Sequence, residues 1–408
     1  MVYLDHAATT PVLPAVVEAV AEAMAVGGNP SSVHSAGRAA RSRIEEAREL
    51  LAALLDAHPS EVLFTSGGTE SDNLAVTGLF QARHRADPAR REILLSGAEH
   101  HAVLDAADHL AATGAARIRR LPVDRNGRVT RDAFADAAAE RPDRIALASV
   151  MWANNETGAV SDIAALSAIA GAAGFPLHTD AVQAVGTLDV DFARSSAAAL
   201  SIAGHKLGGP GGTGLLLLRR DAALVPLQHG GGQERGLRSG TLNVAGAVGL
   251  AVAVEEAVTR RAVRAAEYAR LGRRLIDGVR AIVPDAELTG SDPADQAQLP
   301  GVVHLRFPGC ESETLLMLLD AAGVECSAGS ACTAGVTRAS HVLLAIGLDE
   351  PAARSSLRFS LGHTSSDADI DAVTAVIGEV VRRAKDANAK RTNARAQHVS
   401  PLLTGSPR

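Results

Sequence analysis

The chain has 408 residues, more than one compact core usually holds, so about two domains are expected. A formal net charge of -6 and only 2% aromatic residues provide neither a basic surface nor stacking platforms, which excludes a nucleic-acid-binding protein. No apolar run approaches the length of a membrane span, and the first residues, MVYLDHAATTPVLP, lack the positive start of a signal peptide. We therefore expect a cytoplasmic protein that does not enter a membrane.

The first part of the chain alternates short apolar runs with helical patterns. Helices are expected from Pro14 and, after the loop GNPSSVHSAGRAAR with Ser31 or Ser32 as N-cap, over the stripe that contains Ile44 and Leu51. The runs EVLFT, EILLS, RIRRLPV, RIALASV, PLHTD, AAALSI and GLLLL then read as strands, most of them separated by helices. This order predicts βαβ units and a doubly wound, mostly parallel α/β sheet in a large domain of residues 14–255.

The second part has a different pattern. Helix formers run almost without interruption from Asn243 to Ile282, and a strand GVVHLRF, a helix from Glu311, a short strand VEC, a strand SLRFSL and a final helix from Ser366 follow. This indicates a smaller α+β domain of residues 1–13 and 256–385. The polar segment 386–408 is expected to be a flexible tail.

The stretch AGHKLGGPGGTG places Lys206 directly after an apolar strand. A lysine at the end of a buried strand loses solvation, and its neutral amine can then attack the carbonyl of an aldehyde cofactor to form a Schiff base. Glycine-rich turns also occur in ordinary β-hairpins before a strand. This stretch alone is therefore consistent with either a cofactor lysine or a simple turn.

Other strand ends carry polar residues with complementary chemistry. SGGTESDN, with Gly68 and Thr69, opens a helix and can bind a single phosphate, although a helix merely capped by Thr69 remains an alternative. Asp180 can keep a pyridine nitrogen protonated or serve as an N-cap, and Asn155 can donate to an anionic oxygen. His100 can stack on a flat ring or lie on the surface. Because these strand ends meet in one crevice, together they predict bound pyridoxal phosphate, whereas no metal-ligand spacing is present.

The reaction depends on Cys332, which lies in the loop CSAGSACTAGVTRAS among small residues. Such a loop can carry a reactive thiol into a site. Arg358 lies on a strand of the small domain and can bind a substrate carboxylate, or it can be an ordinary exposed arginine. Cys326 reads as structural, and Cys310 has no identifiable role. Three cysteines without a CxxC spacing fit a reducing compartment.

The chain resembles the cysteine desulfurases of the NifS/IscS type, which are fold-type I pyridoxal phosphate enzymes with a class-V aminotransferase-like fold. The stretches that carry the resemblance are YLDHAATTP, GNPSSVHSAGRAAR, FTSGGTESDN, EHHAVL, MWANNETG, DAVQAVG, GHKLGGPGGTG, GGGQERGLRSGTLN, SAGSACTAG, SHVLLAIG and SLRFSLG.

The resemblance implies conversion of L-cysteine to L-alanine, with the sulfur taken as a persulfide by Cys332 for delivery to a sulfur acceptor or an iron–sulfur scaffold protein. Lys206 would hold the cofactor, and His100 would stack on its ring and take part in proton transfer. The other implied contacts are Asp180 to the pyridine nitrogen, Asn155 and Gln183 to the ring oxygen, Gly68, Thr69 and His205 to the phosphate, Thr241 to the phosphate in the other subunit of a homodimer, and Arg358 with Asn155 to the substrate carboxylate.

Two features depart from the family pattern. Ala203 stands where many members have a serine, which removes one phosphate hydrogen bond, and the C-terminal HVSPLLTGSPR does not resemble the tail with which other members dock a scaffold. Alternatives left open are a selenocysteine lyase or an aminotransferase on the same scaffold, and a non-catalytic sulfur-relay protein.

Overall fold

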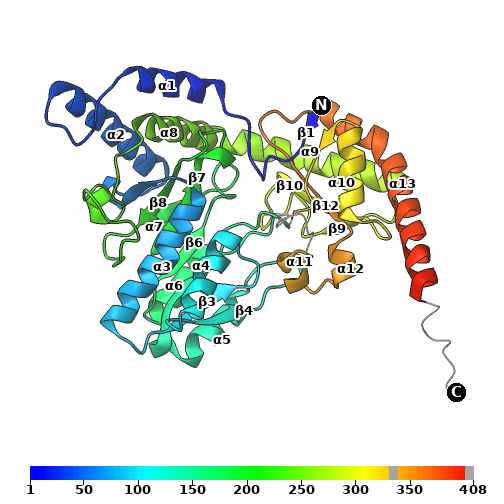
Figure 1. Ribbon diagram of the computed structural model, residues 1–408, viewed down its shortest axis with the longest axis horizontal. Coiled ribbons are helices and arrows are strands. Elements are labelled where there is room, and N and C mark those ends of the chain that lie inside the picture. The colour runs from blue at the N-terminus through cyan, green and yellow to red at the C-terminus, as the bar shows by residue number, and fades with distance from the viewer. Residues whose placement is uncertain (330–338, 400–408) are drawn as a thin grey trace.

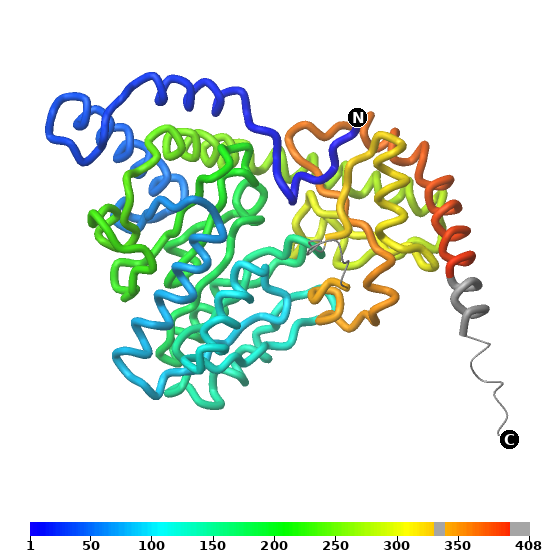
Figure 2. The backbone as a smooth tube through the Cα atoms, viewed as in Figure 1, coloured from blue at the N-terminus to red at the C-terminus, as the bar shows by residue number. Residues whose placement is uncertain are grey.

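The computed structural model describes residues 1–329 and 339–399, with side chains described up to residue 391. Figure 1 shows two sheet-containing units side by side, a larger one and a smaller one that ends in the long helix α13. The N-terminus lies on the smaller unit, and Figure 2 shows the following residues crossing to the larger one. Among the described residues no helix is both long and apolar enough to cross a membrane.

A seven-stranded sheet forms the centre of the large unit, in the order β2-β8-β7-β6-β5-β3-β4. Its strands are β2 (Val62–Thr65), β3 (Glu92–Ser96), β4 (Arg117–Leu121), β5 (Ile145–Ser149), β6 (Leu177–Asp180), β7 (Ala199–Ala203) and β8 (Gly214–Leu218). Only β8 runs antiparallel to its two neighbours, so the prediction of a mostly parallel α/β sheet is confirmed. The parallel strands all end at one edge, where the polar side chains collect.

Helices cover both faces of this sheet because its strands, apart from the edge strand β4, are buried and mostly apolar on both sides. The helices of the large unit are α1 (Pro14–Ala25), α2 (Ser35–Leu54), α3 (Gly68–Ala86), α4 (His101–Ala112), α5 (Arg131–Glu140), α6 (Ile163–Ala172), α7 (Phe192–Ser195) and α8 (Val244–Thr259). On β8, Leu216 packs toward α3 while Leu215 and Leu217 pack toward α2 and α8. This alternation fixes the register of the strand.

The small unit packs helices on an antiparallel sheet of order β12-β10-β9. Its elements are α9 (Arg261–Ile282), β9 (Glu287–Thr289), β10 (Val302–Arg306), α10 (Ser312–Ala321), β11 (Val324–Glu325), α11 (His341–Ala345), α12 (Glu350–Ala353), β12 (Ser356–Ser360) and α13 (Asp367–Val399). Strand β1 (Val2–Tyr3) pairs in parallel with β11, which joins the start of the chain to this unit.

Three local features differ from the sequence-based expectations. The N-cap of α2 is His34, whose Nδ1 accepts a hydrogen bond from the Gly37 amide at 3.3 Å, because the loop containing Ser31 and Ser32 folds back against Gly37. The expected continuous helix from Asn243 is two helices, since Arg260 leaves helical geometry between α8 and α9. Helix α13 continues to Val399, past the expected start of the tail at residue 386, because no proline or glycine interrupts residues 386–399.

Candidate active site

A cavity of about 260 Å³ lies at the carboxyl edge of the large sheet. Its lining combines the ends of four strands with the first turn of α3. The lining residues are Gly68, Thr69, Asp72, His100, Met151, Asn155, Asp180, Val182, Gln183, Ala203, His205 and Lys206. Eight of these residues were predicted from the sequence to belong to the site. The fold brings them into one cavity although they lie up to 138 positions apart in the chain.

The first turn of α3 provides the anion-binding end of the cavity. Gly67 precedes the helix with φ 153° and ψ 179°, a conformation that is essentially restricted to glycine. The amides of Gly68 and Thr69 belong to the first turn of α3, so neither has a hydrogen-bond partner within the helix. Free amides at the positive end of a helix dipole suit a phosphate group.

Asp180 ends β6 and is 5% exposed. One of its carboxylate oxygens, Oδ1, accepts a hydrogen bond from the Val182 amide at 2.9 Å, which leaves the other oxygen for a ligand. Burial raises the pKa of this carboxyl group, while the nearby His100 and Lys206 act in the opposite direction. A protonated ring nitrogen would supply the opposite charge that this buried group lacks.

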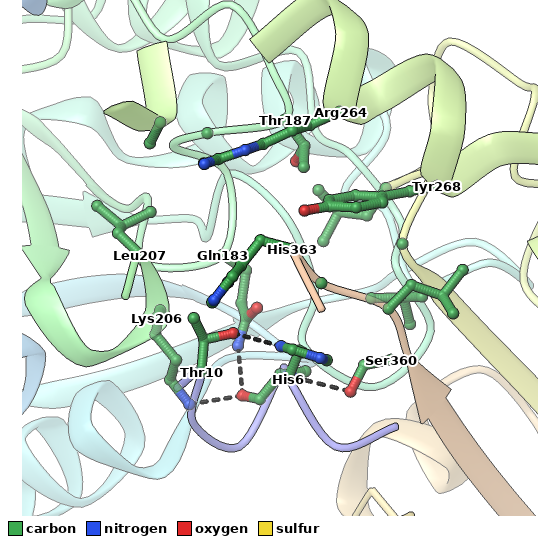
Figure 3. A pocket seen from close by; sticks show the side chains of 18 of the residues that line it. His6, Thr10, Gln183, Thr187, Lys206, Leu207, Arg264, Tyr268, Ser360 and His363 are labelled. Atoms are coloured by element: carbon green, nitrogen blue, oxygen red, sulfur yellow. Dashed lines mark hydrogen bonds between the residues drawn. The ribbon is translucent and has the colours of Figure 1, made fainter. Parts of the chain in front are cut away.

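Lys206 extends from a short 3-10 turn after β7 toward the N-terminal segment of the chain. Its Nζ donates to the backbone carbonyls of Ala7 at 2.6 Å and Ala8 at 2.8 Å, and Figure 3 shows the bond to Ala7. Burial, reinforced by the charge of Arg358, lowers the pKa of the Lys206 amine to about 8. A substantial fraction of neutral amine is therefore present near physiological pH.

Two histidines line the cavity. His100 is the N-cap of α4: its Nδ1 accepts from the Ala102 amide at 3.1 Å, so the proton of the neutral ring lies on Nε2. Desolvation by the cavity walls lowers the pKa of His100 and lowers that of His205 to about 4. Both rings are therefore neutral at pH 7.

Arg358 lies beside the cavity on β12 and is 3% exposed. Its Nη1 donates to the carbonyl of Asn155 at 2.8 Å, and its Nη2 donates to Asp5 Oδ1 at 2.7 Å. Its Nε is buried with no partner among the described residues. The arginine thus joins the two units and still has donors available for a carboxylate.

The family model described as Aminotransferase class-V matches residues 2–373. The chain belongs to the class-V aminotransferase family. It is 54% identical over 387 residues to an IscS-like cysteine desulfurase of Mycobacterium tuberculosis, with 95% of this chain and 98% of the relative covered. It is also 40% identical to the cysteine desulfurase NifS of Azotobacter vinelandii, covering 99% of this chain and 96% of that one.

The fold of this class-V aminotransferase is also similar to that of a solved NifS-like protein. The TM-score is 0.84 at 32% identity, and the match covers 93% of this chain and 99% of the other. The resemblance to the NifS/IscS type and the expected fold class are thereby confirmed.

Sequence reasoning missed one polar residue of this class-V aminotransferase site. Asp72 lines the cavity at 1% exposure, and its Oδ1 has no hydrogen-bond partner among the described residues. His178 Nε2 lies 3.5 Å from that oxygen, and the same ring contacts Ser149 Oγ at 2.9 Å and Ser201 Oγ at 3.0 Å. The available signal was the spacing of Asp72, one helical turn after Gly68 and Thr69.

The remaining candidates lie elsewhere. Thr241 is exposed and does not line this cavity. Cys332 lies outside the described residues. Cys310 is buried with its pKa raised to about 11, and burial also raises the pKa of Cys326 to about 12, so neither thiol is readily ionised.

Proposed function

We propose that this protein is a pyridoxal phosphate-dependent cysteine desulfurase that converts L-cysteine to L-alanine. The observation that carries the proposal is the meeting of Lys206, Asp180 and the first turn of α3 in one cavity. The identity with proteins named cysteine desulfurases supports the same substrate. In the reaction the substrate's C–S bond breaks, its sulfur joins Cys332 in an S–S bond, and the carbon takes a proton to give alanine.

The donor set of the cavity fits pyridoxal phosphate. The amides of Gly68 and Thr69 and the neutral ring of His205 would hold the phosphate, and the free oxygen of Asp180 would pair with the pyridine nitrogen. When bound, the protonated cofactor ring withdraws electrons from the substrate. Because Ala203 has no hydroxyl, the phosphate would depend more on the helix amides than it does where a serine is present.

Lys206 would hold the cofactor covalently. To do so, its Nζ must give up its hydrogen bonds to Ala7 and Ala8, which hold the amine in place beforehand. The lowered pKa makes the neutral amine accessible at modest cost. Gln183 donates to the carbonyl of Ala7 at 2.9 Å, and together with Asn155 it would contact the ring oxygen.

His100 would stack on the ring and handle protons at Nε2. Its cap bond to Ala102 keeps Nδ1 unprotonated, so the ring can donate from Nε2 but cannot become a cation without losing that bond. Arg358 and Asn155 would bind the substrate carboxylate. The buried, unpaired Nε of Arg358 supports this role, because a carboxylate would satisfy it.

The partners belong to the same proposal. We expect a homodimer in which Thr241, exposed on its own chain, reaches the phosphate of the neighbouring site. A sulfur acceptor or an iron–sulfur scaffold protein would take the persulfide, and the cytoplasm would supply the reducing conditions.

The decisive test is the visible spectrum of the purified protein before and after L-cysteine, together with product analysis. Lys206→Ala should abolish the cofactor's visible band. Cys332→Ala should keep the band and lose sulfide production. Cys310→Ala is the matched control and should keep both, because this thiol is buried against the Val381 carbonyl.

A colourless wild-type protein would refute the cofactor assignment. Continued sulfide release by Cys332→Ala would refute the nucleophile, and a keto acid in place of alanine would indicate an aminotransferase.

A further inference from the structure

A second cavity, of about 80 Å³, lies between the two units on the far side of the N-terminal segment. Lys206 and Gln183 line both cavities, while His6 and Thr10 belong to this one only. Figure 3 shows Arg264, Thr187 and Tyr268 on one side of it and Lys206, Thr10 and His6 across from them. The site proposed above makes no use of this space.

The lining of this cavity is one-sided in charge. Among the described residues it contains the cation Arg264 but no aspartate or glutamate, and its lysine, Lys206, is the residue proposed above to hold the cofactor. The imidazoles of His6 and His363 are neutral at pH 7, because burial lowers the pKa of His6 to about 4 and also lowers that of His363. A small cavity with a cation and neutral donors but no carboxylate favours an anionic occupant.

Arg264 is only weakly compensated. The carboxylate with which it pairs, Glu256, lies 3.8 Å away, beyond hydrogen-bond distance, whereas the neighbouring Arg260 approaches the same carboxylate to 2.9 Å. The Arg264 side chain is nevertheless only 16% exposed. A partly buried guanidinium without a close carboxylate has donors available for a ligand.

Two hydroxyl groups complete the set. Thr187 Oγ1 is a buried oxygen with no hydrogen-bond partner among the described residues. Tyr268 is 8% exposed, and in Figure 3 its hydroxyl points into the space beside Arg264. An unpaired buried polar atom such as Thr187 Oγ1 is costly, so a ligand that accepts from it would stabilise the fold.

We propose that this interdomain cavity binds a small oxyanion, either an inorganic ion of the size of sulfate or a short carboxylate, through Arg264, Tyr268 and Thr187. The cavity volume of about 80 Å³ suits an anion of this size. Because the cavity is formed by both units, its occupant stabilises their present arrangement.

The test is a thermal-unfolding titration of the cofactor-loaded protein, whose phosphate-binding turn is already occupied, with sodium sulfate and, separately, sodium acetate. Ionic strength is held constant with gluconate, a larger carboxylate. We expect a saturable rise in Tm at millimolar anion, and the tighter ligand identifies the source as inorganic or carboxylate. General salting effects of sulfate rise without saturation, so saturation marks a site.

Variants locate the effect. Arg264→Gln should raise the half-saturating concentration at least tenfold, and Tyr268→Phe, which removes only a hydroxyl group and preserves the packing, should raise it severalfold. Arg280→Gln, which changes an exposed arginine of the same helix that does not line the cavity, is the matched control and should leave it unchanged. No saturable rise in the wild type, or equal midpoints in all four proteins, would overturn the proposal.

Discussion

The lowered pKa of Lys206 makes a quantitative prediction for the cofactor-free protein. With a pKa of about 8 instead of 10.5, about a tenth of the amine is neutral at pH 7, compared with about one part in three thousand for an ordinary lysine. At equal intrinsic reactivity, Lys206 should therefore react with an aldehyde about 300-fold faster than an ordinary lysine.

The assay is covalent incorporation of pyridoxal phosphate, trapped by borohydride and measured by mass spectrometry as a function of pH. The chain has only two other lysines, Lys385 and Lys390 on α13, and these serve as internal references. Since burial is the largest cause of the shift and Arg358 the next, Arg358→Gln should move the midpoint for Lys206 upward. Asp180→Asn, which removes a negative charge, should move it downward.

A midpoint near 10.5, or labelling of Lys206 at the rate of the α13 lysines, would refute the reasoning. Shifts of the same sign in both variants would show that the charges of Arg358 and Asp180 do not control the pKa of Lys206.

Three further predictions concern stability and substrate binding. Glu234→Ala should cost about 3 kcal/mol in denaturant unfolding, because it removes the buried carboxylate 2.6 Å from the largely buried guanidinium of Arg48 and leaves only the half-exposed Glu45 as an ionic partner. A cost below about 1 kcal/mol would contradict this. Burial raises the pKa of Glu99 to about 8, so between pH 4.5 and 8 the native state holds a proton that the unfolded state releases. The free energy of unfolding should therefore fall by at most about 5 kcal/mol as the pH rises over this range. Glu99→Gln should flatten that dependence, and an unchanged pH profile would disprove the assignment. Arg358→Gln should raise KM for cysteine about 10- to 100-fold, measured by alanine formation, whereas an unchanged KM would exclude it from carboxylate binding.

The sequence was informative about the site because parallel strands bring their carboxyl ends to one edge. Asp180, His100 and Lys206 each follow an apolar run, so their strand-end positions could be read without tertiary information. Asp72 could not be recognised in this way. It lies inside a helix, and its place in the cavity depends on how α3 packs over β6 and β7.

Local signals also failed where the tertiary fold decides the outcome. Arg260 is a good helix former, yet it ends α8 because the chain there crosses from one unit to the other. The cap of α2 depends on contact between Gly37 and the preceding loop, which no propensity of Ser31 or Ser32 reveals.

The contacts of the N-terminal segment could not be predicted from the sequence either. They link the cofactor side of the site to the substrate side. The Ala7 carbonyl accepts from both Gln183 and Lys206, while the Ala7 amide donates to Ser360 Oγ at 2.8 Å on β12. These are backbone groups, so no side-chain pattern in the sequence identifies them. Because Asp5 in the same segment accepts from Arg358, a displacement of this segment alters the groups proposed to hold cofactor and substrate together. The two functions are therefore mechanically coupled through a stretch of chain that carries no catalytic side chain.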